Sequence, residues 1–466
     1  MPATITEAGR RLRDGSLTSE QLIDACFRCI SHLEPKLRAF ITVTEQQALA
    51  DARALDAELR AGRDRGSLHG IPVVYKDNCD TADVPTTMGS ELFRKRVPRE
   101  DATVVRLLNT AGTVMLGKTN MNELAAGGPG GYNKFFGTTR NPWHPDYESG
   151  GSSSGSAVAV AAGLCLGGLG TDGGGSIRGP ASRTGIVGIR PTFGRVSCAG
   201  IFPRAPTLDT CGPFARTATD AALLLSAVAG FDSADPRSLQ APRENFMVGL
   251  EQGVQKLRLG IIDDFAFRDV DPEVSAAVGG AVEKFAELGA EIVSVKLSSL
   301  ESDLIQRSAT NVLLYEFSKV FGSDYRAANS NALGPVVHSD MARAGQISKE
   351  DYDQALSERH VFTTQFKTLF GQIDALLTPT MPTVAPLIAA PDLSGRHRQF
   401  TIPFSFAGLP ALSVPCGFNA VGLPIGLQII GNRLQEGMIL RIAAAYERAT
   451  EFYRRKPQIH CGVSVN

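Results

Sequence analysis

The segments Gly150-Gly-Ser152-Ser-Ser-Gly-Ser156 and Gly170-Thr-Asp-Gly-Gly-Gly-Ser176-Ile-Arg178 decide how this chain is interpreted. Glycine in this part of the chain is far above its average usage of roughly 7%. Gly/Ser-rich segments are often flexible linkers, but residues 157–166 and 186–189 are apolar, and linkers avoid such runs. We therefore predict that these glycines are packed, and that they mark tight backbone geometry or the close approach of a ligand.

The run of three glycines that ends at Ser176 is typical of an anion-binding nest, in which successive backbone N–H groups turn toward one point. Acyl transfer needs such a nest beside a hydroxyl nucleophile, because its tetrahedral intermediate carries an oxyanion. A serine hydroxyl is weak unless a base takes its proton. The segment therefore indicates a site for nucleophilic chemistry at Ser176.

Lys76 is the candidate base. It ends the apolar run 71–75, which is typical of a buried strand, and a lysine whose pKa is lowered by burial can be neutral. Strand alternation directs the next residue, Asp77, to the opposite face. A surface lysine at a strand end fits the residues equally well, so both interpretations stay open at this point.

Two familiar motifs also match, and we expect neither to be functional. Gly168-x-Gly170-x-x-Gly173 fits a dinucleotide fingerprint, but the region near residue 190 lacks the acidic residue that such a site needs. Gly151-x-Ser153-x-Gly155 fits a nucleophile elbow, which requires an acid and then a histidine later in the chain. The available histidines lie in no recognisable site context: His338, His360, His397 and His460.

The sequence resembles the amidase signature family. The resemblance is carried by Gly70-Ile-Pro-Val-Val-Tyr-Lys76-Asp-Asn and by the two Gly/Ser segments quoted above. It continues through residues 188–197, 208–213, 377–380 and 404–426, so it spans nearly the whole chain. The central block is the most specific part of the match.

The resemblance implies a role for each matching residue. Ser176 matches the family's nucleophile, Lys76 its lysine, and Ser152 the serine that bridges them and follows a cis peptide bond, here Gly151–Ser152. The backbone N–H groups of the glycine run are expected to form the oxyanion hole, which assigns it to Gly173, Gly174 and Gly175 together with Ser176. The resemblance implies no metal and no cofactor.

Strands that alternate with helices predict an α/β fold. The family resemblance makes this a single α/β/α domain around a large mixed, mostly parallel sheet. We expect residues 1–65 to form a helical segment packed on the core, and residues 66–466 to form the amidase signature domain, with its core motif at 70–213. Within the first segment, Thr18 and Gln21 predict a capping box, and Pro35 is expected to end the helix that follows.

Composition bounds the function classes. The net charge is -1, from 47 Lys+Arg against 48 Asp+Glu, which indicates neither nucleic acid nor an anionic membrane as a partner. No signal peptide or membrane span is visible. The eight cysteines are scattered, which predicts buried thiols in a reducing compartment, the cytoplasm, and no disulfide framework. Metal or redox chemistry is not expected of the Cys26-x-x-Cys29 pair, which has no second pair and no nearby histidine.

The function expected is an amidohydrolase that cleaves a small-molecule amide through a serine acyl-enzyme. The alternative is a partner-dependent amidotransferase subunit that supplies ammonia, and a non-catalytic scaffold is disfavoured by the intact serines and lysine. Arg359 falls where the family's glutamine-using subunits hold the substrate carboxylate, and Tyr132 and Phe202 are candidate pocket residues. The acid expected before Thr401 is replaced by basic residues at 396–398, which favours a carboxylate-bearing or neutral amide over glutamine. Family members are often dimers, so a homodimer is an expectation that no interface signal supports.

Overall fold

The computed structural model describes residues 2–300, 303–327, 330–392 and 394–463. Its described strands are β1 (Phe40–Val43), β2 (Pro72–Lys76), β3 (Val114–Thr119), β4 (Gly167–Asp172), β5 (Val187–Arg190), β6 (Thr210–Ala215), β7 (Arg258–Ile261), β8 (Glu291–Ser294), β9 (Ala375–Pro379), β10 (Ala411–Phe418) and β11 (Pro424–Ile430). They form one mixed sheet in the order β1-β3-β2-β4-β6-β5-β10-β11-β9-β7-β8. The large mixed sheet expected from the sequence is therefore confirmed.

The expectation that this sheet is mostly parallel was wrong. Of the ten strand pairings among the described residues, four are parallel and six are antiparallel. The parallel pairs join β2 to β3 and β4, and β7 to β8 and β9. An apolar run buried on both faces reads the same in either direction, so the sequence pattern does not distinguish a parallel neighbour from an antiparallel one.

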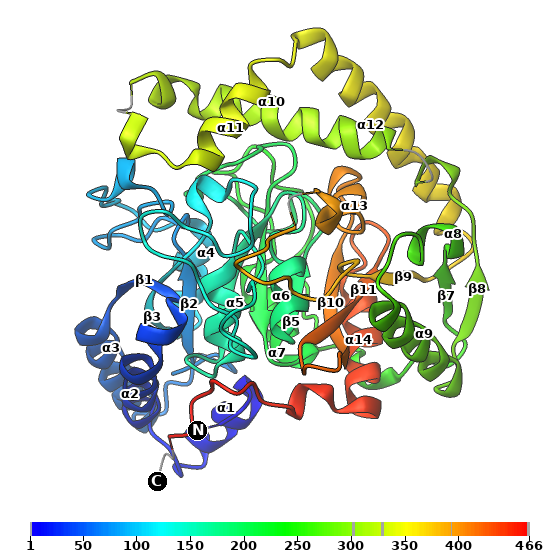
Figure 1. Ribbon diagram of the computed structural model, residues 1–466. Helices are drawn as coiled ribbons and strands as arrows, with labels where there is room; N and C mark the ends of the chain where they lie inside the picture. Colours follow the sequence, from blue (N-terminus) through cyan, green and yellow to red (C-terminus); the bar gives the residue numbers. More distant parts are fainter. Residues whose placement is uncertain (1, 301–302, 328–329, 393, 464–466) are drawn as a thin grey trace.

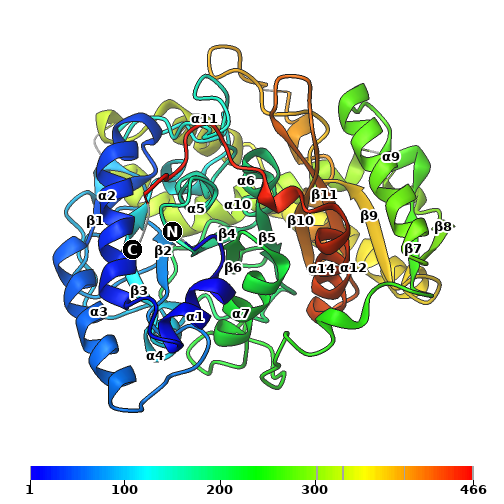
Figure 2. The ribbon, with the colours of Figure 1, turned by 90° about the horizontal axis from the view of Figure 1, so that it is seen from below.

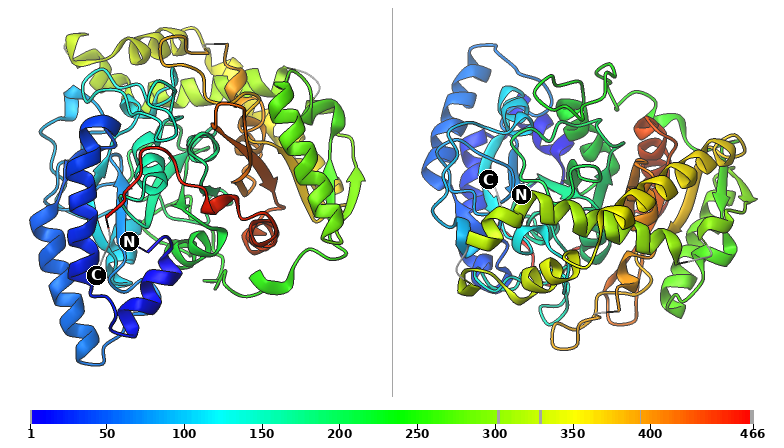
Figure 3. Two further views of the ribbon diagram at one scale, coloured as in Figure 1. Left: turned by 60° about the horizontal axis from the view of Figure 1, so that its bottom comes forward. Right: turned by 90° about the horizontal axis from the view of Figure 1, so that it is seen from above.

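The described α-helices are α1 (Ile5–Arg13), α2 (Ser19–Leu37), α3 (Glu45–Arg60), α4 (Thr103–Thr110), α5 (Ser154–Ala161), α6 (Arg178–Thr184), α7 (Ala218–Val228), α8 (Asp263–Ala266), α9 (Pro272–Glu287), α10 (Leu304–Ala327), α11 (Pro335–Ala344), α12 (Lys349–Leu369), α13 (Ile402–Phe406) and α14 (Glu436–Thr450). Figure 1 shows α10, α11 and α12 crossing one edge of the sheet as a separate layer. The view from above places this layer across the middle of the molecule (Figure 3, right).

Helices cover both faces of the sheet, as the view along its edge shows (Figure 2). One apolar core lies between the sheet and α4, α7, α9 and α14, and a second lies between the sheet and α2, α3 and α5. Strand β2 contributes to both cores, because successive side chains of a strand point to opposite faces. Val73 and Tyr75 join the first core and Val74 joins the second.

The start of α2 follows its sequence signals, but its end does not. Thr18 and Gln21 form the predicted capping box. The helix passes through Pro35 and ends at Leu37, and the capping residue Arg38 has a left-handed φ of 52°. The Glu34 carboxylate accepts hydrogen bonds from the backbone N–H groups of Ala39 and Phe40, both at 3.0 Å. A proline interrupts bonds only on its N-terminal side, and this carboxylate holds the turn that follows.

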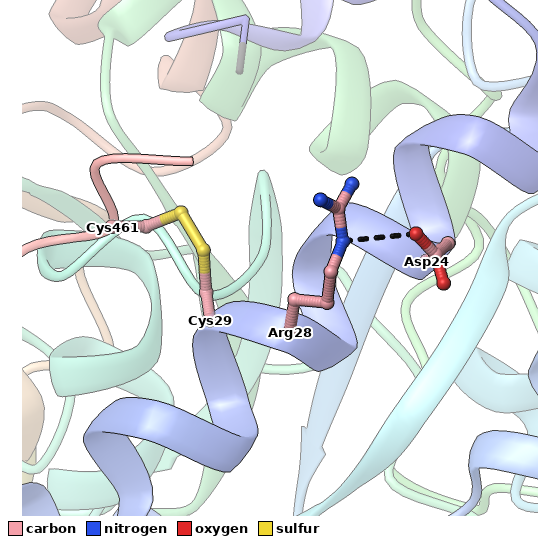
Figure 4. Close-up of a disulfide and its surroundings, with 4 residues drawn as sticks. All are labelled: Asp24, Arg28, Cys29 and Cys461. Carbon is pink, nitrogen blue, oxygen red and sulfur yellow. Dashed lines mark ion pairs between the residues drawn. A yellow bond between two sulfur atoms is a disulfide. The ribbon is translucent and has the colours of Figure 1, made fainter. Parts of the chain in front are cut away.

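The cysteines depart from the expectation of free thiols in one place. Cys29 on α2 forms a disulfide with Cys461, across a sequence separation of 432 residues (Figure 4). The bond joins the C-terminal segment to α2 (Figure 4). The pairing joins two ends of the chain that fold against one another, which the spacing of cysteines in a sequence does not reveal. The six other cysteines form no disulfide and are buried.

The described helices include none that is both long enough and apolar enough to cross a membrane.

Candidate active site

Lys76 lies at the end of β2 and is fully buried, which excludes the interpretation as a surface lysine. Its Nζ donates hydrogen bonds to Ser152 Oγ at 2.7 Å and to Thr171 Oγ1 at 2.8 Å. Burial lowers the pKa of this amine to about 8, because a low-dielectric site disfavours the charged form. A substantial fraction of the amine is therefore neutral near physiological pH.

Asp77 faces away from Lys76, as strand alternation predicts. Its carboxylate accepts a hydrogen bond from the Thr87 backbone N–H at 2.9 Å and lies 3.9 Å from Lys118 Nζ. Among the ion pairs of the described chain, none involves Lys76. The amine is thus surrounded by hydroxyl groups, and no paired carboxylate stabilises its charged form.

Ser152 precedes α5, and the Gly151–Ser152 peptide bond is cis, as the resemblance implies. The Asn122 backbone N–H donates to the Ser152 carbonyl at 3.2 Å. A Cβ at position 151 would lie 2.5 Å from Asn122 Oδ1, so only glycine fits against this neighbour. Close packing of Asn122 and Gly151 therefore sets the course of the backbone that places Ser152 beside Lys76.

Ser176 lies in the turn between β4 and α6 and is only partly buried. It lines the same cavity as Ser152. The Ser153 backbone N–H donates to the Ser176 carbonyl at 3.3 Å, which ties the two Gly/Ser segments together. The structure thus brings Lys76, Ser152 and Ser176 into one site from three separate parts of the chain.

The glycine run offers fewer free N–H groups than the sequence predicts. The Gly175 N–H donates to Asp172 Oδ1 at 2.6 Å, so it is already occupied. Gly173 is buried outside the cavity lining, with its Cα hydrogens directed at Asp209. Gly174 and Ser176 line the cavity, and within the described residues their N–H groups have no hydrogen-bond partner. They are the groups available to an oxyanion.

A buried ion pair supports this turn, and sequence reasoning did not anticipate it. Arg178 Nε donates to Asp172 Oδ2 at 3.0 Å and Arg178 Nη2 donates to Asp172 Oδ1 at 3.1 Å. Arg178 also bonds Gln428 at 2.7 Å and Ser405 at 2.6 Å. These contacts hold the pKa of Asp172 well below its usual value. The sequence did offer a signal for this pair, because Asp172 and Arg178 are opposite charges within one glycine-rich segment predicted to be packed. Charges are buried in proteins mainly when they are paired.

The site opens into a cavity of about 400 Å³, near the lower end of the range for small-molecule sites. The three side chains suggested from sequence as pocket residues are not part of its lining. Tyr132 borders a separate small hollow. Phe202 packs near Phe93, with ring centroids 6.2 Å apart. Arg359 Nε donates to the Phe406 carbonyl at 2.6 Å and Arg359 Nη2 to the Thr207 carbonyl at 2.9 Å, so its guanidinium is committed to backbone groups.

The charged groups that do line the cavity come from distant parts of the sequence. They are Glu148, Arg183, Arg204, Asp340, Arg343, Asp392 and Arg398. Of these, only the basic stretch at 396–398 was noted in the sequence. The others lie in loops and on α6 and α11, and only the folded chain brings them together. Arg183 and Glu148 form a buried pair at 3.2 Å.

Comparison with known proteins shows which family this chain matches. A family model described as Amidase matches residues 21–440. The glutamyl-tRNA(Gln) amidotransferase subunit of Myxococcus xanthus that matches this chain is 40% identical over 480 residues, which cover 97% of this chain and 98% of that protein. Its name fits the partner-dependent alternative better than the self-sufficient hydrolase expected from the sequence.

Two solved structures share the fold. The native peptide amidase of Stenotrophomonas maltophilia has a TM-score of 0.86 and 33% identity, covering 98% of each chain. A chain from a vestigial protein complex, described as revealing the evolutionary origins of an s-triazine catabolic enzyme, has a TM-score of 0.90 and 30% identity, covering 96% of this chain and 98% of that one.

Proposed function

This chain belongs to the amidase signature family, and from that premise we propose that it cleaves a carboxamide C–N bond through an acyl-enzyme on Ser176. The observation that carries the proposal is that the buried Lys76 amine is hydrogen-bonded to the Ser152 hydroxyl, and that Ser152 lines the same cavity as Ser176. The neutral amine, the bridging hydroxyl and a nucleophile beside free N–H groups are the parts that acyl transfer needs.

The proton path begins at Ser176. As its oxygen attacks the amide carbonyl, its proton passes to Ser152, whose own proton passes to the neutral amine of Lys76. The carbonyl oxygen becomes an oxyanion that accepts hydrogen bonds from the N–H groups of Gly174 and Ser176. Each such donor is worth about 3–4 kcal/mol in the transition state.

Collapse of the tetrahedral intermediate breaks the C–N bond. The proton returns from Lys76 through Ser152 to the nitrogen, because an amide nitrogen leaves poorly unless it is protonated. Ammonia or an amine departs and the acyl group stays on Ser176. Water, deprotonated through the same path, then attacks the ester and releases the carboxylic acid.

Two versions of this function differ in their need for partners. The names of the curated relatives favour an amide-cleaving subunit that passes ammonia to an acceptor held by partner chains. The likeness to peptide amidase, together with Arg398 near the position where an acid is expected to hold the amino group of glutamine, favours a self-sufficient hydrolase. We place the partner-dependent version first, because identities of 38–40% over nearly whole chains support it.

Ammonia release tests both the chemistry and the choice of version. The purified chain is incubated with glutamine, with neutral amides and with carboxylate-bearing amides. Ser176→Ala is the test variant and Ser154→Ala, in the same segment but within α5, is its control. Release by wild type and S154A but not by S176A supports the proposal, and substantial release by S176A would exclude it. Release from glutamine that needs an added partner subunit supports the first version, whereas rapid release by the chain alone supports the second.

A further inference from the structure

One wall of the catalytic cavity holds an excess of positive charge. Arg204 Nη2 donates to Asp340 Oδ2 at 2.5 Å, and Arg343 Nη1 lies 3.7 Å from Asp340 Oδ1. Arg398 lines the same cavity, and in the described part of the chain its guanidinium has no hydrogen-bond or ion-pair partner. Two of these three arginines, Arg204 and Arg343, contact the carboxylate of Asp340, and Arg398 is left without a paired carboxylate among the described residues.

Each of these groups reaches the cavity from a different element. Arg204 lies in the loop before β6, Asp340 and Arg343 lie on α11, and Arg398 ends a short 3-10 turn at Arg396–Arg398. Arg204 is 5% exposed, and its guanidinium lies 3.6 Å from the centre of the Phe317 ring. The ring and Asp340 hold Arg204 in place. Arg398 is unpaired among the described residues, and the exposed Arg343 makes only the longer contact of 3.7 Å with Asp340, so both can turn toward a ligand.

The other charged groups of the cavity offset only part of this positive charge. Arg183 is paired with Glu148, which leaves Asp392, whose carboxylate accepts a hydrogen bond from the Ser394 backbone N–H, as the one further negative charge among the described lining residues. Burial and the nearby Arg398 and Arg183 lower the pKa of His397 to about 3, so its ring is neutral at pH 7. A guanidinium does not shed its proton in proteins, and a partly buried charge without a partner is costly. An anion bound at this wall would relieve that cost.

We propose that Arg398, assisted by Arg343 and by the fixed charge of Arg204, binds a carboxylate carried by the amide substrate. This rests on the proposed function, since it places the carboxylate in the cavity that holds Ser176. The planar guanidinium fork matches a carboxylate in shape and charge. A cavity of about 400 Å³ suits a small amide acid. The sequence suggested Arg359 as the residue that binds the carboxylate. We assign that role to Arg398 because the N–H donors of Arg359 are already bonded to the Phe406 and Thr207 carbonyls.

Binding is measured by calorimetry in the full chain with Ser176→Ala, so that the ligand is not consumed. The probes are glutaric acid monoamide and butyramide, which differ in the carboxylate. We expect the monoamide to bind at least tenfold more tightly than butyramide, and Arg398→Gln to weaken its binding by at least tenfold. The matched control is Arg396→Gln, because Arg396 borders the outer groove and donates to the Asp269 carbonyl. This control should change binding by less than twofold.

Two further variants keep the test decisive. Arg343 is exposed, so Arg343→Gln should fold normally, and it should also weaken binding of the monoamide by several fold. Arg398→Lys keeps the charge and should bind more tightly than Arg398→Gln. Equal binding of the two probes, or equal losses in Arg398→Gln and Arg396→Gln, would overturn the proposal.

Measurements of ammonia release distinguish the proposed carboxylate site from the proposed catalytic role of Ser176, on which it rests. In wild type, kcat/KM should be at least tenfold higher for the monoamide than for butyramide. In Arg398→Gln, the ratio of these two kcat/KM values should be lower. Tight binding of the monoamide with ammonia release that persists in Ser176→Ala would refute the catalytic proposal and support the anion subsite. Ammonia release that depends on Ser176 without preference for the carboxylate would refute the subsite and support the catalytic proposal.

Discussion

The Lys76 amine lies 2.7 Å from the Ser152 hydroxyl, in a position that solvent does not reach. Burial has a direct chemical effect here, because it lowers the pKa of the amine to about 8. A lysine in water, with a pKa near 10.4, is almost entirely protonated at pH 7 and cannot accept a proton. The surroundings of Lys76 are therefore as important to the proposed chemistry as its identity.

The pH dependence of catalysis follows from this shift. Lys76 must be neutral to act as a base, so kcat/KM should rise about tenfold per pH unit below pH 8 and level off above it. Ammonia release between pH 5.5 and 9.5 gives the profile. A profile whose rising limb is centred near pH 6 would point to a carboxylate or histidine base and contradict the assignment.

Replacement of Lys76, the proposed base, should cause a severe loss of activity. Lys76→Met keeps the length of the side chain and adds no polar atom to the core, so the fold should persist. We expect kcat to fall by about 10²–10⁴-fold, the range for loss of general-base catalysis. Circular dichroism and the unfolding temperature serve as the folding control. A well-folded variant that retained more than a tenth of wild-type activity would argue against the proton path.

The glycine run should tolerate a side chain at one position and not at its neighbour. Gly175 has φ of +125°, and a Cβ there would collide with the Thr401 side chain. At Gly174 the nearest atom to an added Cβ is Ile402 Cγ1 at 3.4 Å. Gly175→Ala should therefore lower the free energy of unfolding by about 1–3 kcal/mol, whereas Gly174→Ala should retain the wild-type unfolding temperature within a few degrees. Urea unfolding of both variants measures the difference, and equal effects would contradict it.

The Asp172–Arg178 pair should be essential for stability. Arg178→Met leaves the Asp172 carboxylate buried without its main partner, which should cost about 3–5 kcal/mol. The control is Lys349→Gln, which removes an exposed pair with Asp353 and should cost less than about 1 kcal/mol. Denaturant unfolding gives both values. If the two variants lost similar stability, the buried pair would not be the support that its contacts indicate.

The Cys29–Cys461 disulfide should make stability sensitive to reductant. Reduction should lower the unfolding temperature, because a typical disulfide contributes about 2–4 kcal/mol by restricting the unfolded chain. Cys461→Ser should have the lowered value with or without reductant. The comparison uses four unfolding curves, for wild type and for Cys461→Ser, each with and without reductant. If reductant also lowered the unfolding temperature of Cys461→Ser, the effect would have to come from other cysteines. Ammonia release should be the same before and after reduction, since the bond lies away from the catalytic cavity.

Much of the local structure could be predicted because its causes are local. The capping box at Thr18 and the strand that ends at Lys76 both follow from nearby residues, and the structure has both of them. The direction of strand pairing was not predictable in the same way, nor was the end of α2 beyond Pro35. Both depend on contacts with residues elsewhere in the chain.

By itself, the sequence determined the family, the α/β class and the residues proposed for chemistry, because these follow from local motifs and from the alternation of strands with helices. Tertiary structure alone decided that Lys76 is buried and that the Gly175 N–H is occupied by Asp172. It also decided that Arg204 and Arg343 meet at Asp340, in the cavity that Arg398 lines. These are consequences of burial and distance between residues far apart in the chain. The free energy of a charge or an N–H group depends on which neighbours replace water around it, and folding alone determines those neighbours.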